Sequence, residues 1–391
     1  MQFSDLKVGV PCEILQGEKR VAVTPETSEK MVNEGARVLV ESGAGEKAYF
    51  SDAEFEKAGA EIVPGPEDVY KDVDVVLKVK EPQFNEEIGR HEAEMMSEDT
   101  VLISFLHPAN SHNHEMVEKL ADAGVTGFTL DAIPRISRAQ SMDALTSMST
   151  VAGYRSVIIA ASHLRKFMPM IPTATGTMGP AEVLVIGSGV AGLQAIGTAN
   201  RLGAKVKSFD IRPEANEQAK SLGADVLDIE IPSDLAVSED GYAQRLPEEW
   251  YEKERQALKE HVENSDVVIL AALIMGEEAP VLVTEDMVEN MDDGSAIVDI
   301  AIDQGGNCEV SKAGEEIFYD NVSISAILNM PASLPIDSTN MLAQNIHRYF
   351  SHLFSDGELD LNMDDEIVSN TLVTKDGEVK HEGTLRAMDK I

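Results

Sequence analysis

The chain has 391 residues, of which 43% are hydrophobic; this is enough apolar material for two domain cores and excludes a disordered protein. Asp and Glu number 69 against 32 Lys and Arg, and the formal net charge of −37 excludes nucleic acid and anionic membrane surfaces as direct partners. The acidic residues are scattered along the chain, so we interpret them as the solvated surface of a halophilic protein, in which salt screens the self-repulsion.

The first third of the chain alternates strand-like and helix-like segments. Strands are predicted at residues 6–11, 36–43, 73–80 and 100–106, where β-branched residues are frequent. Helices are predicted at residues 24–35, 53–60 and 113–124, with Asp52 capping the second and Gly124 ending the third. This alternation is typical of a mostly parallel sheet covered by helices.

A long helix is predicted over residues 142–167, followed by a Pro/Gly/Thr-rich segment at 169–181 that indicates a domain boundary. A second β-α series runs from residue 181 to about 325, and a helix within 329–354 returns the chain to the first domain. We therefore expect two Rossmann-like doubly wound α/β domains with a nucleotide cleft between them. Residues 1–141 with 326–391 form a discontinuous N-terminal domain, and residues 142–325 form the second domain.

Cysteine content and hydropathy indicate a cytoplasmic protein. Cys12 and Cys308 are too few for a disulfide framework, and the N-terminus lacks the basic and apolar regions of a signal peptide. No run approaches the roughly 18 consecutive apolar residues of a membrane span. We expect no direct membrane insertion, so any work at a membrane requires spans from another chain.

The second domain opens with a glycine-rich turn between a strand and a helix. Gly187, Gly189 and Gly192 form G-x-G-x-x-G, where the glycines permit a tight turn, the approach of a pyrophosphate and close helix packing. Val190 begins the helix, whose N-terminal N–H groups and dipole favour phosphate. A lone motif of this kind is weak, but here its strand and helix context is complete.

Asp210, at the end of the next strand, is the expected partner of the adenosine ribose. Its carboxylate accepts hydrogen bonds from the ribose hydroxyls and repels a 2′-phosphate, which predicts NAD(H) as the cofactor. Ile211 and Arg212 follow. An arginine here is able to accommodate a 2′-phosphate, but beside Asp210 we expect Arg212 to stack near the adenine edge.

Residues 134–157, PRISRAQSMDALTSMSTVAGYRSV, closely resemble the signature loop of the NAD(H)-binding component of proton-translocating transhydrogenases, a fold shared with alanine dehydrogenases. The resemblance covers nearly the whole chain and includes RVAVTP, SEDGYAQRLPEEWYEKE, AALIMGEEAP, GGNCE and DDEIVSNTLVTKDGEV. It implies hydride transfer from NADH here to NADP⁺ on a separate NADP(H)-binding subunit, coupled to proton movement through a membrane-spanning subunit. It also implies a homodimer, located peripherally at the cytoplasmic face of the membrane.

The resemblance also assigns residues to the cofactor. The loop residues that would line the nicotinamide are Arg135, Gln140, Asp143 and Thr146. Ser141 and Met142, which lie between them in sequence, are also assigned to cofactor binding. Thr146 replaces the serine expected there and keeps the hydroxyl. Gly241 and Tyr242 match a mobile loop whose tyrosine closes over the nucleotide. Hydride transfer needs two nicotinamide rings held close and dry, so orientation by Gln140, Arg135 and Asp143 is the implied catalytic contribution.

A second set of residues matches the substrate site of alanine dehydrogenases. Arg20 and Lys80 would hold a carboxylate and carbonyl, His107 would act as general acid and base, and Asp303 would position ammonia or water. NAD-dependent deamination of L-alanine to pyruvate is therefore the alternative activity. These residues also fit structural roles without a substrate, and a module that only senses NAD is a further alternative. We expect no metal site, because the histidines of residues 107–114 have no common zinc spacing.

Overall fold

The computed structural model describes residues 2–229, 231–237, 243–274 and 278–390. The chain divides into two compact units, the first formed by Met1–Met148 with Ala332–Ile391 and the second by Ser149–Pro331. The first unit is therefore discontinuous in sequence. The chain passes between units at 148/149 and 331/332, where the sequence placed the boundaries at 141/142 and 325/326.

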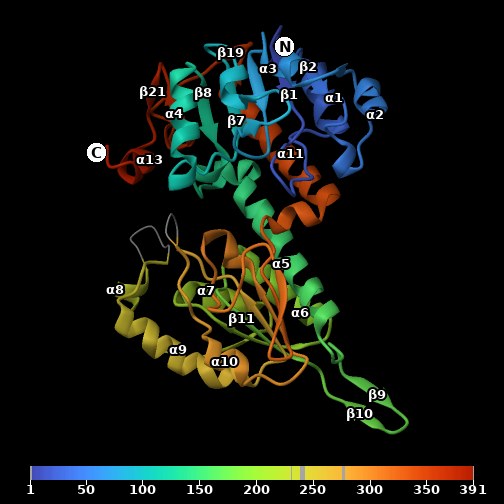
Figure 1. The fold of residues 1–391 in the computed structure, drawn as a ribbon, viewed down its shortest axis with the longest axis vertical. Coiled ribbons are helices and arrows are strands. Elements are labelled where there is room, and N and C mark those ends of the chain that lie inside the picture. The colour runs from blue at the N-terminus through green and yellow to red at the C-terminus, as the bar shows by residue number, and fades with distance from the viewer. Residues whose placement is uncertain (1, 230, 238–242, 275–277, 391) are drawn as a thin grey trace. The chain divides into compact units, whose positions relative to one another are not determined.

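Unit 1 contains an eight-stranded sheet with the order β21-β20-β8-β7-β4-β1-β2-β3 (Figure 1). The six strands from β8 to β3 are parallel, and β20 and β21 extend the sheet antiparallel. The strand bounds are β1 (Lys7–Val10), β2 (Arg37–Glu41), β3 (Glu61–Val63), β4 (Val75–Leu77), β7 (Val101–Ser104), β8 (Thr126–Thr129), β20 (Leu372–Lys375) and β21 (Glu378–Val379). Two-stranded pairs occur at β5 (Phe84–Asn85) with β6 (Arg90–His91) and at β18 (Phe354–Ser355) with β19 (Glu358–Leu359).

The helices of unit 1 are α1 (Pro25–Asn33), α2 (Asp52–Lys57), α3 (Pro66–Tyr70), α4 (His114–Asp122), α11 (Pro335–Leu353), α12 (Glu366–Thr371) and α13 (Glu382–Ala387). Short 3₁₀ turns are η1 (Glu46–Ala48), η2 (Glu92–Met95), η3 (Ser111–Asn113), η4 (Leu130–Ala132) and η5 (Ser137–Met142). The expected cap of α2 is wrong by one residue. Ser51 is the N-cap, and its N–H and hydroxyl donate to Glu54 Oε2 at 2.8 and 2.7 Å. Asp52 instead accepts from the Ser42 hydroxyl at 2.7 Å.

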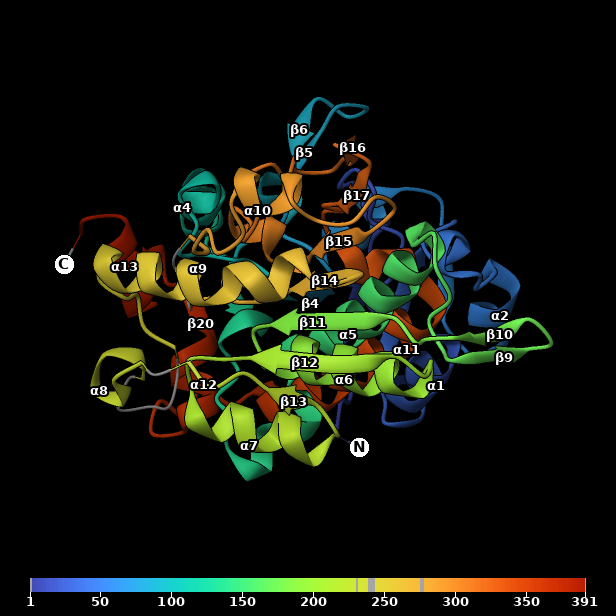
Figure 2. The ribbon, with the colours of Figure 1, turned by 90° about the horizontal axis from the view of Figure 1, so that it is seen from below.

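Unit 2 contains a seven-stranded sheet with the order β13-β12-β11-β14-β15-β17-β16 (Figure 2). The strands are β11 (Glu182–Ile186), β12 (Lys205–Phe209), β13 (Asp225–Val226), β14 (Val267–Leu270), β15 (Ala296–Asp299), β16 (Glu316–Tyr319) and β17 (Val322–Ser325). All neighbours pair in parallel except β16 with β17. The order reverses between β11 and β14, which is where doubly wound sheets bind dinucleotides.

Helices cover both faces of this sheet because its strands are apolar on both sides. Val183 and Val185 pack in a core with residues of α5 (Ala144–His163) and α6 (Val190–Arg201), whereas Leu184 and Ile186 pack against α9 (Glu248–Glu263). Complete burial of each such side chain stabilises the fold by about 1.5–3 kcal/mol. The remaining helical elements are α7 (Pro213–Ser221), α8 (Ser233–Ala236), α10 (Glu285–Glu289), η6 (Ile300–Gln304) and η7 (Met330–Ser333).

The Pro/Gly/Thr-rich segment forms a hairpin within unit 2 and is not the domain boundary. β9 (Ile171–Thr173) and β10 (Gly176–Met178) pair antiparallel and project from the unit (Figure 1). The Thr173 hydroxyl donates to the Gly176 carbonyl at 2.7 Å and closes the turn. The segment interrupts helix formation as expected, but the chain has already entered unit 2 within α5. Among the described residues, no helix is long and apolar enough to cross a membrane.

Candidate nucleotide and substrate sites

Two glycines of the turn after β11 are required by the fold itself. Gly187 has a φ of +91°, and a Cβ there would lie 2.6 Å from the backbone of Ala271 at the end of β14. A Cβ at Gly192 would lie 1.8 Å from the Gly187 carbonyl oxygen. Any larger residue would therefore separate α6 from the strand that precedes it.

Gly189 differs because the fold does not demand it. Its φ of −72° suits any residue, and the nearest atom to a Cβ there would be Arg212 Nη2 at 3.8 Å. The glycine leaves open space beside the N-terminus of α6, where main-chain N–H groups lack helical partners. Val190 is the first residue of that helix. This arrangement fits a pyrophosphate approaching the backbone, so the residues present suit a dinucleotide.

Asp210 is buried immediately after β12, and donors surround its carboxylate. Oδ1 accepts from the N–H of Arg212 at 2.8 Å and from Arg212 Nε at 2.9 Å. Oδ2 accepts from the N–H of Ser188 at 2.7 Å and from Arg212 Nη2 at 2.8 Å. The Arg212 guanidinium thus pairs with the Asp210 carboxylate. The sequence analysis had instead predicted that it stacks near the adenine edge. Ile211 packs its partly buried side chain against the core under α9.

Glu254 is a buried acid near Asp210 that the sequence analysis missed. It lies on α9 with 3% of its surface exposed, and its Oε2 has no hydrogen-bond partner among the described residues. Burial raises the pKa of Glu254 to about 8, and the negative charge of Asp210 acts in the same direction. At neutral pH Glu254 is therefore protonated. Its position in an amphipathic helix gave no signal distinguishing it from the exposed acids beside it.

The signature loop occupies η5 and the start of α5. Arg135, Gln140 and Ser141 are exposed, and Met142 is half-buried. Asp143 accepts from the N–H of Thr146 at 2.8 Å and from its hydroxyl at 2.6 Å, so it caps α5. In this structure Asp143 and Thr146 therefore serve to cap a helix. Gly241 and Tyr242 of the expected mobile loop lie outside the described residues.

Lys80 and His107 of the alternative substrate set are in contact in unit 1. Lys80 Nζ is 3.2 Å from His107 Nε2, and His107 Nδ1 is 2.7 Å from Asp131 Oδ1. Burial raises the pKa of Asp131, but the His107 charge and the hydrogen bonds from His107 and Thr129 outweigh it and lower that pKa to about 2. Asp131 was missed by the sequence analysis, because no local spacing links it to His107.

The other two members of that set have different partners. Arg20 is buried and paired with Glu18, with Nε–Oε1 and Nη2–Oε2 distances of 2.7 and 2.6 Å. Asp303 lies in unit 2, is exposed and accepts from the N–H of Asn329 at 3.1 Å. The structure therefore brings Lys80 and His107 together, balances the charge of Arg20, and gives Asp303 a main-chain partner.

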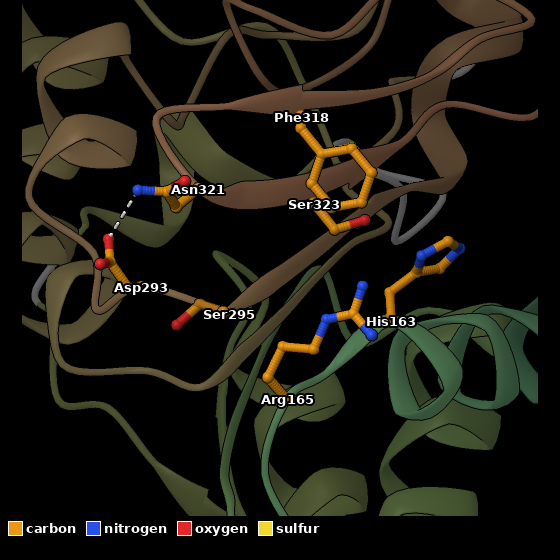
Figure 3. A pocket seen from close by; sticks show the side chains of 8 residues that line it. His163, Arg165, Asp293, Ser295, Phe318, Asn321 and Ser323 are labelled. Carbon is orange, nitrogen blue, oxygen red and sulfur yellow. Dashed lines mark hydrogen bonds between the residues drawn. The ribbon is translucent and has the colours of Figure 1, made fainter.

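A surface cavity of about 400 Å³ lies elsewhere in unit 2 (Figure 3). Its lining residues include His163, Arg165, Ser295 and Ser323. Ser295 directly precedes β15, so the cavity is at the N-terminal end of that strand. Dinucleotides bind at the carboxyl ends of strands, and none of the predicted site residues lines this cavity.

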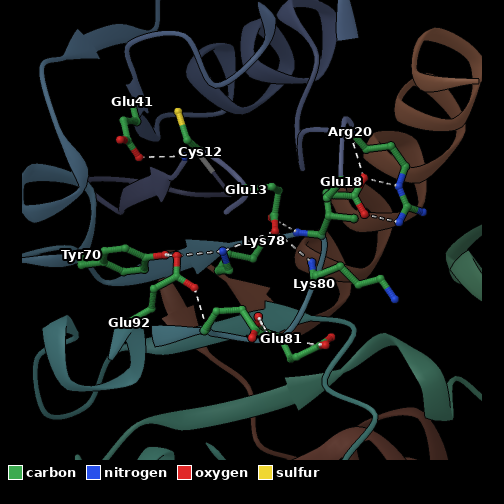
Figure 4. A network of polar contacts seen from close by, with 12 residues as sticks. Cys12, Glu13, Glu18, Arg20, Glu41, Tyr70, Lys78, Lys80, Glu81 and Glu92 are labelled. Carbon is green, nitrogen blue, oxygen red and sulfur yellow. Dashed lines mark hydrogen bonds and ion pairs between the residues drawn. The ribbon is translucent and has the colours of Figure 1, made fainter. Parts of the chain in front are cut away.

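A buried ionic network holds the strand end that carries Lys80 (Figure 4). Lys78 Nζ lies 3.1 Å from Glu92 Oε1 and 3.4 Å from Glu13 Oε2. Glu13 also accepts from the N–H groups of Val79 at 2.6 Å and Lys80 at 3.4 Å. Burial lowers the pKa of Lys78, but Glu13 and Glu92 together raise it above its usual value. The network fixes the backbone of residues 78–80 and so orients Lys80.

The sequence and the fold of the chain match those of a known protein family. Residues 9–152 match the family described as "Alanine dehydrogenase/PNT, N-terminal domain", and residues 156–382 match its C-terminal domain. The chain is 40% identical to a Rhodospirillum rubrum protein, the first of the parts that make up its NAD(P) transhydrogenase subunit alpha, over 96% of this chain and 98% of the relative. A transhydrogenase structure from Sinorhizobium meliloti has a TM-score of 0.81 and 35% identity, covering 96% and 99% of the two chains. An L-alanine dehydrogenase structure has a TM-score of 0.80 and 28% identity, covering 98% and 99%.

Proposed function

Because the chain belongs to the family of alanine dehydrogenases and NAD(P) transhydrogenase alpha subunits, we propose that it is the NAD(H)-binding subunit of a proton-translocating NAD(P) transhydrogenase. The observation that carries the proposal is the turn of unit 2. Gly189 leaves open space at the N-terminus of α6, and Asp210 lies buried beside that turn. A pyrophosphate and a ribose diol fit these two positions.

In this proposal NADH delivers its hydride to NADP⁺ bound on a partner subunit. The two electrons and the hydrogen leave the dihydronicotinamide together, so no protein group has to supply or accept a proton. The protein contributes orientation and exclusion of water. Arg135 and Gln140 extend exposed side chains from the signature loop and are proposed to hold the nicotinamide. Asp143 and Thr146, which cap α5, are proposed to fix the loop and meet the ribose.

The proposed assembly contains further chains. A membrane-spanning subunit conducts protons and another site binds NADP(H), while this chain forms a homodimer at the cytoplasmic face. The name of the R. rubrum relative, an alpha subunit divided into parts, supports a multi-subunit enzyme. The net charge of −37 supports a halophilic setting, in which salt screens the repulsion between copies.

The proposal is tested by combining the purified chain, in high salt, with the NADP(H)-binding and membrane subunits of the R. rubrum enzyme. We expect NADH-dependent reduction of NADP⁺. Gln140→Asn should slow the hydride step about tenfold while the Kd for NADH stays unchanged, because a shorter side chain misplaces the nicotinamide by roughly 1 Å. Gln218→Asn, on the exposed face of α7, is the matched control. An unchanged rate for Gln140→Asn would remove that residue from its role, and absence of NADH binding would end the proposal.

A second candidate is NAD-dependent alanine dehydrogenation, favoured by the contact of Lys80 with His107 and of His107 with Asp131. The reaction converts L-alanine, NAD⁺ and water to pyruvate, ammonium, NADH and a proton. Lys80 would polarise the carbonyl and His107 would move the proton. Absorbance at the NADH band, with NADH, pyruvate and ammonium added to the chain alone, distinguishes the two functions. Steady turnover supports the dehydrogenase, whereas NADH binding without turnover supports the transhydrogenase subunit.

A further inference from the structure

The four donors on the Asp210 carboxylate divide into two kinds. Each oxygen accepts one main-chain N–H, from Arg212 on Oδ1 and from Ser188 on Oδ2. Each oxygen also accepts one guanidinium N–H, from Nε and Nη2 of Arg212 at 2.9 and 2.8 Å. A carboxylate offers about four lone-pair positions, so these donors saturate it. The main-chain donors are fixed by the fold, while the guanidinium donors belong to a side chain able to rotate.

The main chain of Asp210 is itself held in place. Its N–H donates to Asn216 Oδ1 at 3.2 Å, and its carbonyl accepts from Asn216 Nδ2 at 2.8 Å. Release of the guanidinium would therefore leave the carboxylate oriented by its two main-chain donors. It would free one acceptor position on each oxygen. A vicinal diol needs the same two positions for its pair of hydroxyl donors.

We propose that Arg212 is a built-in competitor of the adenosine ribose, and that displacing it sets both the affinity for NAD(H) and the preference over NADP(H). The inference rests on the proposed NAD(H) site. The paired N–H groups of Arg212 take the place of the two ribose hydroxyls. Arg212 Nη2 also lies 3.8 Å from the Cβ position of Gly189, so the guanidinium stands beside the space assigned to the pyrophosphate.

The same side chain has an opposite effect on the two cofactors. For NAD(H), breaking the ion pair is a cost, because Asp210 and Arg212 are only 5% and 20% exposed at their side chains. For NADP(H), the displaced guanidinium is positioned to pair with the 2′-phosphate and to offset its repulsion by Asp210. Arg212 therefore weakens NAD(H) binding and narrows the preference for it.

The test measures dissociation constants by calorimetry in high salt for NADH, NADPH, 5′-AMP and 2′,3′-dideoxy-AMP. Arg212→Ala is expected to bind NADH and AMP roughly three- to tenfold more tightly, the range expected for loss of a partly buried ion pair. The Kd for dideoxy-AMP should not fall, because that ligand lacks both hydroxyls and gains nothing from a freed carboxylate. NADPH binding should weaken. Arg212→Lys should give intermediate values, because one ammonium cannot cover both oxygens in parallel.

Arg37→Ala is the matched control. Arg37 makes the same type of two-point pair with Glu61 in unit 1, at 2.6 Å through both nitrogens, far in sequence from the glycine turn. The Arg37→Ala substitution changes the net charge by the same amount as Arg212→Ala and should leave the dissociation constants of all four ligands unchanged. Unchanged or weaker AMP and NADH binding by Arg212→Ala would overturn the inference alone. Failure of the unmodified chain to bind NADH would overturn the proposed function and the inference together.

Discussion

Lys80 Nζ lies 3.2 Å from His107 Nε2, although the two residues come from different strand ends of unit 1. On the other side of the His107 ring, Asp131 Oδ1 lies 2.7 Å from Nδ1. Asp131 Oδ2 accepts a hydrogen bond from the main-chain N–H of His107 at 2.7 Å. His107 has a φ of +44°, a strained conformation that persists only where surrounding contacts fix it. These contacts orient the His107 ring as a general base requires.

Asp131→Asn therefore tests the alternative activity. Loss of the carboxylate misorients the ring, so a pyruvate-reducing activity should fall about 100-fold, while the Kd for NADH stays constant. In the folded protein the pKa of Asp131 is lowered to about 2. The stability that ionised Asp131 contributes is therefore fully present above the pKa of this group in the unfolded chain, and it is lost only as the pH falls toward 2. The rate of pyruvate reduction should therefore not change with pH through the titration of Asp131 above about pH 4. Asp122→Asn, exposed at the end of α4, is the control.

Substitutions at two glycines should separate folding from nucleotide binding. Gly192→Ala places a methyl 1.8 Å from the Gly187 carbonyl, so the backbone must move, and we expect a loss of about 2 kcal/mol in the free energy of unfolding. Gly189→Ala meets nothing closer than 3.8 Å and should leave stability within about 0.5 kcal/mol.

NADH binding by Gly189→Ala should not follow its stability. Gly189→Ala should still weaken NADH binding at least about tenfold, because its methyl fills the space left for pyrophosphate. Denaturant titration and NADH titration of both proteins give the two quantities. A Gly189→Ala protein that binds NADH normally would argue against a pyrophosphate at this turn.

Asp210→Ala should weaken NADH binding by about 2 kcal/mol, or roughly 30-fold, because two hydrogen bonds to a charged acceptor are lost. Its preference for NADH over NADPH should shrink, since the carboxylate no longer repels a 2′-phosphate while Arg212 remains. Asp225→Ala removes the same charge from an exposed position on β13 and should change neither constant. Equal behaviour of the two variants would contradict the assignment of Asp210 to the ribose.

Glu254→Gln should stabilise the protein at alkaline pH. The folded pKa of Glu254 is about 8, so between about 4.5 and 8 the folded state holds a proton that the unfolded state has released. Stability from this group therefore falls as pH rises through that window. Glutamine carries no charge, so the Tm of the variant should be close to that of the unmodified chain at about pH 5 and exceed it by several °C at about pH 8. Glu252→Gln, exposed on the same helix, should show no such pH-dependent gain.

Much of the fold follows from local sequence patterns. Buried parallel strands are continuous apolar runs, so β1, β2, β4 and β7 fall inside predicted segments. The doubly wound fold class is confirmed, with the reversal of strand order next to the predicted glycine turn. The antiparallel strands β20 and β21 were not predicted. Both are short, and β20 depends on pairing with β8, more than 240 residues away in sequence, as the hydrogen bond of Gly127 with Thr374 illustrates. β21 in turn pairs with β20.

The sequence by itself determined the glycine-rich turn, because its glycines and Asp210 are related by a fixed local spacing within one β-α-β unit. It also placed Lys80 and His107 at the ends of strands that turned out to be neighbours. Only the tertiary structure decided what surrounds these groups. The pairing of Arg212 with Asp210, the placement of Asp131 behind His107, and the burial of Glu254 depend on side-chain directions and on helices packed from distant parts of the chain. Spacing fixes which residues share a turn, whereas charge balance and burial are properties of the whole packed unit.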